Sequence, residues 1–241
     1  MSSEEPFFPA TRWTLVGRLH GSSKAEADRA LNEICRHYWY PIFALLRHEG
    51  HSPPDAEDLT QGFFAALLAD RALLRADPER GRLRNFLLGA LKRFLADEFR
   101  HRTAKKRGGG VPLVSFERET AEHRYLSGPL DEHDPEKLYL TAWAHSLVDR
   151  VRQKMKAEFP GGEEAYAHLA PFIEGDAVDM PYRQLAAKLG RTESGARVAV
   201  HRLRQRFREL LTAAVRQTVE SPGEVDEELA WVLSVLRRRD A

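Results

Sequence analysis

The stretch PYRQLAAKLGRTESGARVAVHRLRQRF, residues 181–207, contains two apolar patterns of helical spacing with a glycine between them. The first pattern predicts a helix over residues 182–189 that buries Leu185 and Ala186. Gly190 supplies a tight turn, and Thr192 is a residue type that caps the start of a second helix. Helix, tight turn and capped helix in this order predict a helix-turn-helix.

The second helix of this motif has two faces of opposite character. One face is a continuous apolar stripe, which predicts burial; it consists of Ala196, Val200, Leu203, Phe207, Leu210 and Ala214. The opposite face carries Arg197, His201, Arg202, Arg204 and Arg208. In helix-turn-helix proteins such a helix enters the major groove of DNA. An arginine face that is merely solvated is the alternative interpretation.

Position along the second helix separates two kinds of DNA contact. We expect the residues near its start to face base edges, where arginine can read guanine and valine can meet a thymine methyl group; these are Ser194, Arg197, Val198 and His201. We expect the later cations to hold phosphates, which adds affinity without sequence information; these are Arg202, Arg206 and Arg208.

The rest of the chain also predicts helices, so the expected fold class is all-α. Leucine and alanine recur at helical spacing almost everywhere, and strand-like alternation is scarce. Helices are expected over residues 24–49, where Pro41 could bend or break the helix, and over residues 83–99, 136–159 and 163–173. An amphipathic segment over residues 220–241 closes the chain, and the sequence assigns it no role.

The amino-acid composition limits the classes of protein to which this chain can belong. The chain has 241 residues, 42% of them hydrophobic, which is enough for one or two folded domains. Its formal net charge is only +1, but cations crowd residues 100–107 and 191–208 while acids dominate residues 117–136. The single cysteine, Cys35, is expected to be a buried, inert thiol in a reducing cytoplasm. No apolar run is long enough to predict membrane insertion.

A second candidate for nucleic-acid binding lies in residues 80–107. Cations alternate there with three phenylalanines, Phe86, Phe94 and Phe99. Single-stranded nucleic acid is bound by such mixtures, because bases stack on aromatic rings while cations follow the backbone. The alternative is that most of these rings lie in the core, and the residues alone leave the two interpretations evenly balanced.

The stretch DAEDLTQGFF, residues 55–64, resembles an active site because three carboxylates stand within four residues. A helix capped by Ser52 and starting near Pro53 would bury Ala56, Leu59, Phe63 and Ala66 on one face. Acids in its first turn favour the positive end of the helix. The remaining polar edge, Asp55, Asp58 and Gln61, is then expected to be an exposed docking surface and not a catalytic site.

Enzyme chemistry is not predicted. HEGH, residues 48–51, spaces its histidines by three and lacks the HExxH pattern of zinc proteases, and no third ligand follows at a suitable spacing. No glycine-rich phosphate loop or nucleophile elbow is present. We therefore expect no metal and no cofactor. A magnesium-dependent nuclease would have to use the acids of DAEDLTQ.

Taken together, DAEDLTQGFF, DPERGRLRNFLLGALKRFLADEFR and YRQLAAKLGRTESGARVAVHRLRQRFRELL resemble bacterial sigma factors of the extracytoplasmic-function type, in a long-linker branch. The resemblance implies two helical domains joined by an acidic linker. The expected boundaries are an N-terminal extension with a short helix (1–23), a sigma region 2-like domain (24–108), the linker (109–135), a region 4-like domain (136–219) and an amphipathic tail (220–241).

The resemblance also implies partners and roles. The partners would be core RNA polymerase, through its clamp helices and flap, and promoter DNA, with an anti-sigma factor as a further partner. Polymerase would contact Asp55, Asp58, Gln61 and Phe64. The minus-ten element would contact Arg80, Arg82, Arg84, Asn85, Lys92, Arg93 and Arg100. The minus-35 element would contact Thr192, Ser194, Arg197, Val198, His201, Arg202, Arg206 and Arg208. The acidic linker would either mimic nucleic acid or simply be solvated.

Two features depart from the family pattern. At Val198 and Ala199 the family more often has a polar residue followed by a cation, which favours an apolar base contact by Val198. The helix before the turn, within HLAPFIEGDAVDM, is a weak match to the usual leucine-rich version. A helix-turn-helix repressor or activator that binds duplex DNA without polymerase is the alternative function, and it predicts a ligand pocket or dimer face in the N-terminal half.

Overall fold

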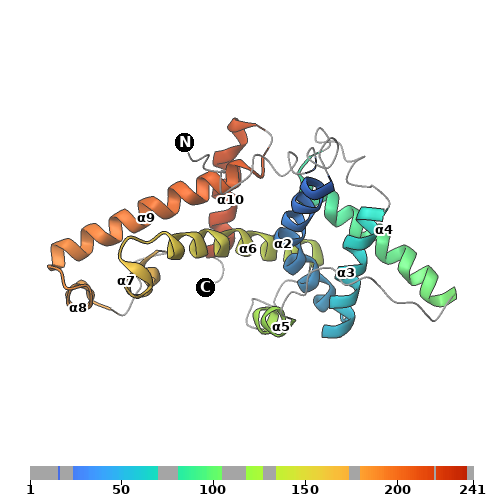
Figure 1. Ribbon diagram of the computed structural model, residues 1–241, viewed down its shortest axis with the longest axis horizontal. Coiled ribbons are helices and arrows are strands. Elements are labelled where there is room, and N and C mark those ends of the chain that lie inside the picture. Colours follow the sequence, from blue (N-terminus) through green and yellow to red (C-terminus); the bar gives the residue numbers. More distant parts are fainter. Residues whose placement is uncertain are drawn as a thin grey trace. The chain divides into compact units, whose positions relative to one another are not determined.

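The structure, a computed structural model, describes Val16 and residues 24–69, 81–104, 118–126, 134–173, 180–219 and 221–237. Helices are the only regular elements in these residues, and they contain no strand (Figure 1). The predicted all-α class is therefore confirmed. Within the same residues, no helix is both long enough and apolar enough to cross a bilayer.

The chain divides into two compact units whose limits differ from the expected domains. The first unit combines Met1–Ser146 with Gln217–Ala241, and the second is Leu147–Arg216. The segment expected to be a separate tail therefore belongs to the first unit. The helix Pro135–Ala157, α6, contributes its first half to one unit and its second half to the other.

The first unit contains six helices in the described residues besides the 3-10 turn η4, Pro222–Glu224. These are α2 (Lys24–His48), α3 (Pro53–Ala69), α4 (Leu83–Ala104), α5 (Arg118–Leu126), the first half of α6, and α10 (Val225–Arg237). The second unit contains the rest of α6, α7 (Gly162–Leu169), η3 (Ala170–Phe172), α8 (Tyr182–Lys188) and α9 (Glu193–Arg216).

Helix α2 runs through Pro41 without a break. A proline removes one helical hydrogen bond and strains the preceding turn, but burial on both sides of it offsets that cost. Ile42, Phe43 and Leu46 are fully buried, and Trp39 stacks on Phe43 with ring centroids 5.1 Å apart. Cys35 is buried on the same helix, and desolvation raises the pKa of its thiol to about 12, as the prediction of an inert thiol requires.

The HEGH sequence is the end of α2. Gly50 takes a left-handed φ of +91°, its amide donates to the carbonyl of Arg47 at 3.1 Å, and the amide of His51 donates to that of Leu46 at 3.1 Å. These two bonds satisfy carbonyls that the helix leaves open at its C-terminus. Ser52 then caps α3 by accepting the amide of Asp55 at 3.3 Å, which confirms the predicted helix start.

Part of the predicted linker is a helix packed on α2. In α5, Glu122 accepts two hydrogen bonds from Arg47, at 2.6 and 2.7 Å, and this hydrogen bonding raises the pKa of the Arg47 guanidinium. Arg124 lies 3.8 Å over the ring of Tyr40. Polar composition alone predicts a solvated linker; the ion pair and the cation–π contact give residues 118–126 a tertiary partner instead. Residues 109–117 and 127–133 lie outside the described residues.

The first half of α6 supplies the centre of the first unit. Leu138 and Ala142 form a buried cluster with Ala44, and Tyr40 and Tyr125 pack against it. Tyr139 is fully buried, and its hydroxyl donates to the backbone carbonyl of Arg84 at 3.2 Å. This bond fixes the start of α4 against α6.

Gly50 and Gly89 form a matched pair of glycines in the first unit. An alanine Cβ at Gly50 would meet no atom within 4 Å, so Gly50→Ala tests the backbone alone, and we expect it to lower the free energy of unfolding by ~1–2 kcal/mol. Gly89 lies inside α4, where an alanine Cβ would make an ordinary contact at 3.8 Å. Gly89→Ala should therefore raise the free energy of unfolding by ~0.5–1 kcal/mol.

Urea unfolding followed by circular dichroism measures both changes. Equal effects of the two substitutions would contradict the left-handed conformation of Gly50.

Candidate nucleic-acid interface

The turn between α8 and α9 is closed by backbone bonds and one capping side chain. Gly190 has a left-handed φ of +60°, its amide donates to the carbonyl of Ala187 at 3.3 Å, and the amide of Arg191 donates to that of Ala186 at 2.9 Å. The amide of Gly195 then donates to Thr192 Oγ1 at 3.1 Å. The predicted turn glycine and helix cap are both confirmed.

The inner face of α9 is the predicted apolar stripe. All six stripe residues, Ala196, Val200, Leu203, Phe207, Leu210 and Ala214, are buried, as are Leu185 and Ala186 of α8. Arg204 does not lie on the outer face of α9, so the prediction that placed it there is wrong. It is half-buried, and its Nε donates to the backbone carbonyl of Phe172 at 2.8 Å. That bond holds α9 to η3.

The residues expected to face bases are all exposed on α9: Ser194, Arg197, Val198 and His201. Val198 is 48% exposed, which is unusual for a large apolar side chain inside a well-packed unit. Arg197 lies 4.3 Å over the ring of Tyr182 and bonds Glu193 at 2.8 Å. A surface ion pair of this kind contributes only ~0–1 kcal/mol, so DNA can replace it at little cost.

The cations expected to hold phosphates fall on two different sides of α9. Arg208 follows Arg197 by three helical turns and therefore shares its face. Arg202 and Arg206 instead border a groove of about 500 Å³. Arg206 also pairs with Glu158 at 3.4 Å and with Glu209 at 3.5 Å.

This groove lies wholly within the second unit. Its lining is mainly apolar and includes Met155, Phe159, Leu169, Leu189, Ala199 and Leu203. Arg191, Arg202 and Arg206 also line it, with one acid, Glu158. Its volume and apolar character are typical of sites that bind one bulky apolar group. The arginines favour a ligand in which an acidic group lies next to that apolar group.

Helix α4 presents cations and one aromatic ring to solvent. Asn85, Lys92, Arg93 and Arg100 are exposed, and Phe99 is 73% exposed. Lys92 and Phe99 are two turns apart, so they share a face. Phe94, in contrast, packs on Phe63 with ring centroids 5.8 Å apart. Phe99 therefore presents its ring to solvent, whereas the ring of Phe94 packs against a buried one.

Some of these cations have acidic neighbours within the first unit. Lys92 pairs with Glu136 at the start of α6, and Arg100 pairs with Asp97 at 2.5 Å. Both pairs are exposed, so they hold the side chains only weakly. Arg80, assigned to the minus-ten element, lies outside the described residues.

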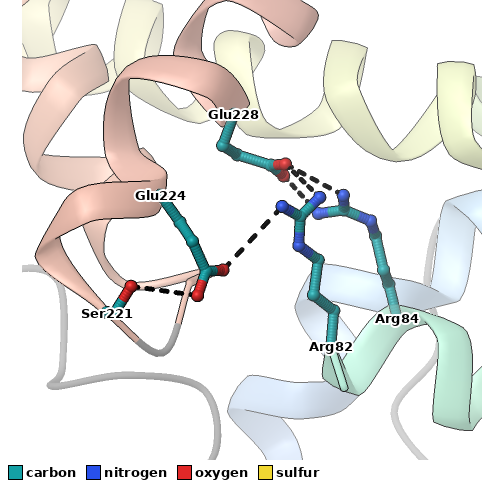
Figure 2. Close-up of polar contacts among 5 residues, drawn as sticks. All are labelled: Arg82, Arg84, Ser221, Glu224 and Glu228. Carbon is teal, nitrogen blue, oxygen red and sulfur yellow. Dashed lines mark hydrogen bonds and ion pairs between the residues drawn. The ribbon is translucent and has the colours of Figure 1, made fainter.

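Arg82 and Arg84, expected to contact DNA, both point to one acid of α10 (Figure 2). Arg84 makes a two-point bond to the carboxylate of Glu228, with Nη2 to Oε2 at 3.1 Å, and Arg82 pairs with the same carboxylate. Arg84 is 5% exposed and Glu228 only 1%. Arg82 also approaches Glu224 at 3.9 Å, which accepts a hydrogen bond from Ser221 at 3.0 Å.

Two neighbouring indole rings lie against the Arg84 guanidinium. Its central carbon lies 4.3 Å from the ring centre of Trp143 on α6 and 5.1 Å from that of Trp231 on α10. The two rings are themselves 6.1 Å apart at their centroids. Cation–π attraction adds to the ion pair at this depth. Arg84 thus joins α4, α6 and α10.

The sequence carries a signal for this cluster that the pattern of cations alone does not show. Arg84 stands at the N-terminal end of the apolar face formed by Leu87, Leu88 and Leu91, all of them buried. Glu228 stands in the middle of the stripe formed by Val225, Leu229, Val232 and Leu236, also buried. A charge on an apolar helix face needs an opposite charge when it is buried, so two such charges of opposite sign are candidate partners.

The expected polymerase surface of α3 is exposed in part. Asp55 and Asp58 are exposed and Gln61 is half-buried. Asp55 Oδ2 accepts a hydrogen bond from Ser52 at 2.5 Å, so this acid has a structural role. Phe64 is only 1% exposed and packs beside Phe63. It supports α3 from the core and presents no ring to a partner.

Comparisons with family models, with curated proteins and with solved structures gave no match to this chain. In the part of the chain that the structure describes, no cluster of three or more histidine, cysteine, aspartate or glutamate side chains is arranged to hold a metal ion.

Removing Glu228 should destabilise the first unit strongly. Glu228→Ala leaves two guanidiniums without their shared carboxylate, and losing one partner of a buried ion pair costs ~3–5 kcal/mol. Urea unfolding followed by tryptophan fluorescence measures the loss.

Glu227→Ala is the matched control, because this neighbouring acid of α10 is exposed. We expect it to change the free energy of unfolding by no more than ~0.5 kcal/mol. Similar losses for both variants would contradict the burial of Glu228.

Proposed function

We propose that this chain is a sigma factor of the extracytoplasmic-function type, which binds core RNA polymerase and directs promoter-specific initiation. The observation that carries the proposal is the outer face of α9. A capped helix with its other face fully buried presents Ser194, Arg197, Val198 and His201 together to solvent. Hydrogen-bonding, cationic and apolar groups on one helix face are what reading of a major groove requires.

A second nucleic-acid surface supports the proposal. Helix α4 exposes Lys92, Arg93, Arg100 and the ring of Phe99. Base stacking on an exposed ring contributes ~1–3 kcal/mol per base, tolerates any base sequence and uses bases of a single strand. The second unit thus suits duplex DNA, and the first unit suits an opened strand. Transcription initiation uses both kinds of surface, whereas a repressor needs only the surface for duplex DNA.

Protein contacts with polymerase have two candidate surfaces. The acids Asp55 and Asp58 on α3 suit a basic partner, the clamp helices by the resemblance. The apolar groove of the second unit suits a protruding apolar side chain, and the resemblance names the flap. Transcription from chromosomal promoters, in the cytoplasm of a bacterium, follows from the proposal.

Binding to core RNA polymerase is the decisive test. The purified chain should be retained by immobilised bacterial core polymerase and should direct run-off transcription from a cognate promoter. Asp58→Arg reverses the charge of an exposed acid, so we expect it to abolish retention while circular dichroism stays unchanged. Glu164→Arg, at an exposed acid of α7, is the control and should be retained normally.

Failure of the unmodified chain to bind core polymerase would overturn the proposal. Tight binding of the chain alone to one duplex operator would then favour the repressor or activator. Magnesium-dependent cleavage of DNA that is lost in Asp58→Asn would favour the nuclease.

Arg197 and Arg208 should differ in what their removal changes. Arg197→Ala should reduce discrimination at one base pair by ~1–3 kcal/mol, because a base contact is lost. Arg208→Ala should weaken all sequences alike and reduce the salt dependence of binding by about one phosphate contact. Selection from a randomised duplex library by the polymerase complex, followed by sequencing, measures both. A uniform loss for Arg197→Ala would contradict its assignment to base reading.

A further inference from the structure

The cluster of Arg82, Arg84 and Glu228 has the chemistry of an occupied anion site. The fork of a guanidinium binds a carboxylate and a phosphate oxygen pair with the same two-point geometry. Glu228 uses both of its oxygens on Arg84 and is shared with Arg82. Two cations that converge on one carboxylate would meet a phosphate equally well.

Helix α10 brings a flat ring to the site as well as an acid. Trp231 and Trp143 of α6 both lie against the Arg84 guanidinium, with ring centres 5.1 Å and 4.3 Å from its central carbon. Without α10, the site would consist of two guanidiniums beside the single indole of Trp143. An anion and an adjacent aromatic plane are also what one nucleotide offers, in its phosphate and its base.

The cluster continues the exposed surface of α4. Asn85, next to Arg84 in the chain, is exposed, and Lys92 and Phe99 follow on the same helix. Arg82 is the partly open member, with 28% of its side chain exposed, whereas Arg84 is covered. In the closed arrangement, the surface that suits an opened strand therefore lacks its deepest cation.

We propose that α10 is an intramolecular competitor of single-stranded DNA, in which Glu228 and Trp231 occupy the place of a nucleotide phosphate and base on Arg82, Arg84 and Trp143. This inference rests on the proposed function and names a regulation of its strand-binding surface. A strand that displaces α10 gains both guanidiniums. Until then the acids of α10, including the exposed Asp226 and Glu227, repel the backbone of any approaching DNA.

The first test uses the full chain and a fluorescent single-stranded DNA of random sequence. Glu228→Gln keeps the shape of the side chain and removes its charge, so we expect the affinity to rise by about tenfold. The slope of log affinity against log salt should steepen by about 1.4, which is ~0.7 for each of two added phosphate contacts. Adding Arg84→Gln to this variant should reverse both changes.

Glu227→Gln is the matched control, because it removes the same charge from the outer face of α10. An effect equal to that of Glu228→Gln, in affinity and in salt slope, would overturn the proposal, since the gain would then come from net charge alone. A salt slope unchanged in Glu228→Gln would overturn it too.

A second measurement needs no substitution. Amide hydrogen exchange of residues 225–237 in the unmodified chain should accelerate when the same DNA is added to saturation. It should also accelerate in an initiating complex with core polymerase. Unchanged protection of α10 in both states would overturn the proposal and give α10 a purely structural role.

These outcomes separate the inference from the proposed function. Unchanged protection of α10, both with DNA alone and in an active polymerase complex, removes the inference and leaves the sigma-factor proposal intact. The opposite outcome is also distinguishable. If the chain never binds core polymerase but Glu228→Gln still gains affinity for single strands, the proposed function is wrong. The role of α10 as a competitor of single-stranded nucleic acid then stands.

Discussion

A buried carboxylate needs cations or hydrogen-bond donors for its oxygens. In the first unit this requirement applies to Glu228, and it brings α4 and α10 together. The acid is almost fully covered, yet it is bound by two guanidiniums 144 residues or more away in the chain. Leaving water is expensive for Arg84 and Glu228, so each needs the other, and the partly exposed Arg82 adds a second cation to the same carboxylate. The ion pair therefore specifies which helix faces meet, while the surrounding leucines and valines supply the attraction between them.

The second unit is held together by different means. Its core includes the apolar stripe of α9, to which α8 adds Leu185 and Ala186. The second half of α6, α7 and η3 contribute further buried residues, among them Val151, Leu169 and Phe172. Polar contacts there act at the edges: Thr192 caps a helix, and Arg204 ties α9 to a carbonyl. Because no described charge is essential to that core, the cations of α9 remain at its surface. The helical spacing of apolar residues in α9 therefore explains both the burial of the stripe and the exposure of the opposite face.

Periodicity predicts much of this structure, but it cannot decide what a charge on an apolar face will meet. It gives the helix-turn-helix, the buried stripe and the starts of α3 and α9, because local hydrogen bonds and spacing determine them. The family resemblance places Arg84 among the DNA contacts and Phe64 on the polymerase surface, and both are buried. Polar composition predicts a solvated linker where α5 forms, and the amphipathic pattern of residues 220–241 does not show that α10 belongs to the first unit. For α5 and α10 the deciding partner, such as Arg47 for Glu122, comes from a distant part of the chain.

The connectivity of the first unit has a consequence for synthesis of the protein. Residues 147–216 are inserted between its two parts, and α10 is made after all of them. During translation the guanidiniums of Arg82 and Arg84 emerge long before Glu228 exists, so the first unit waits for its last helix. All residues of the second unit, in contrast, precede α10 in the chain, so its core needs nothing that is made later.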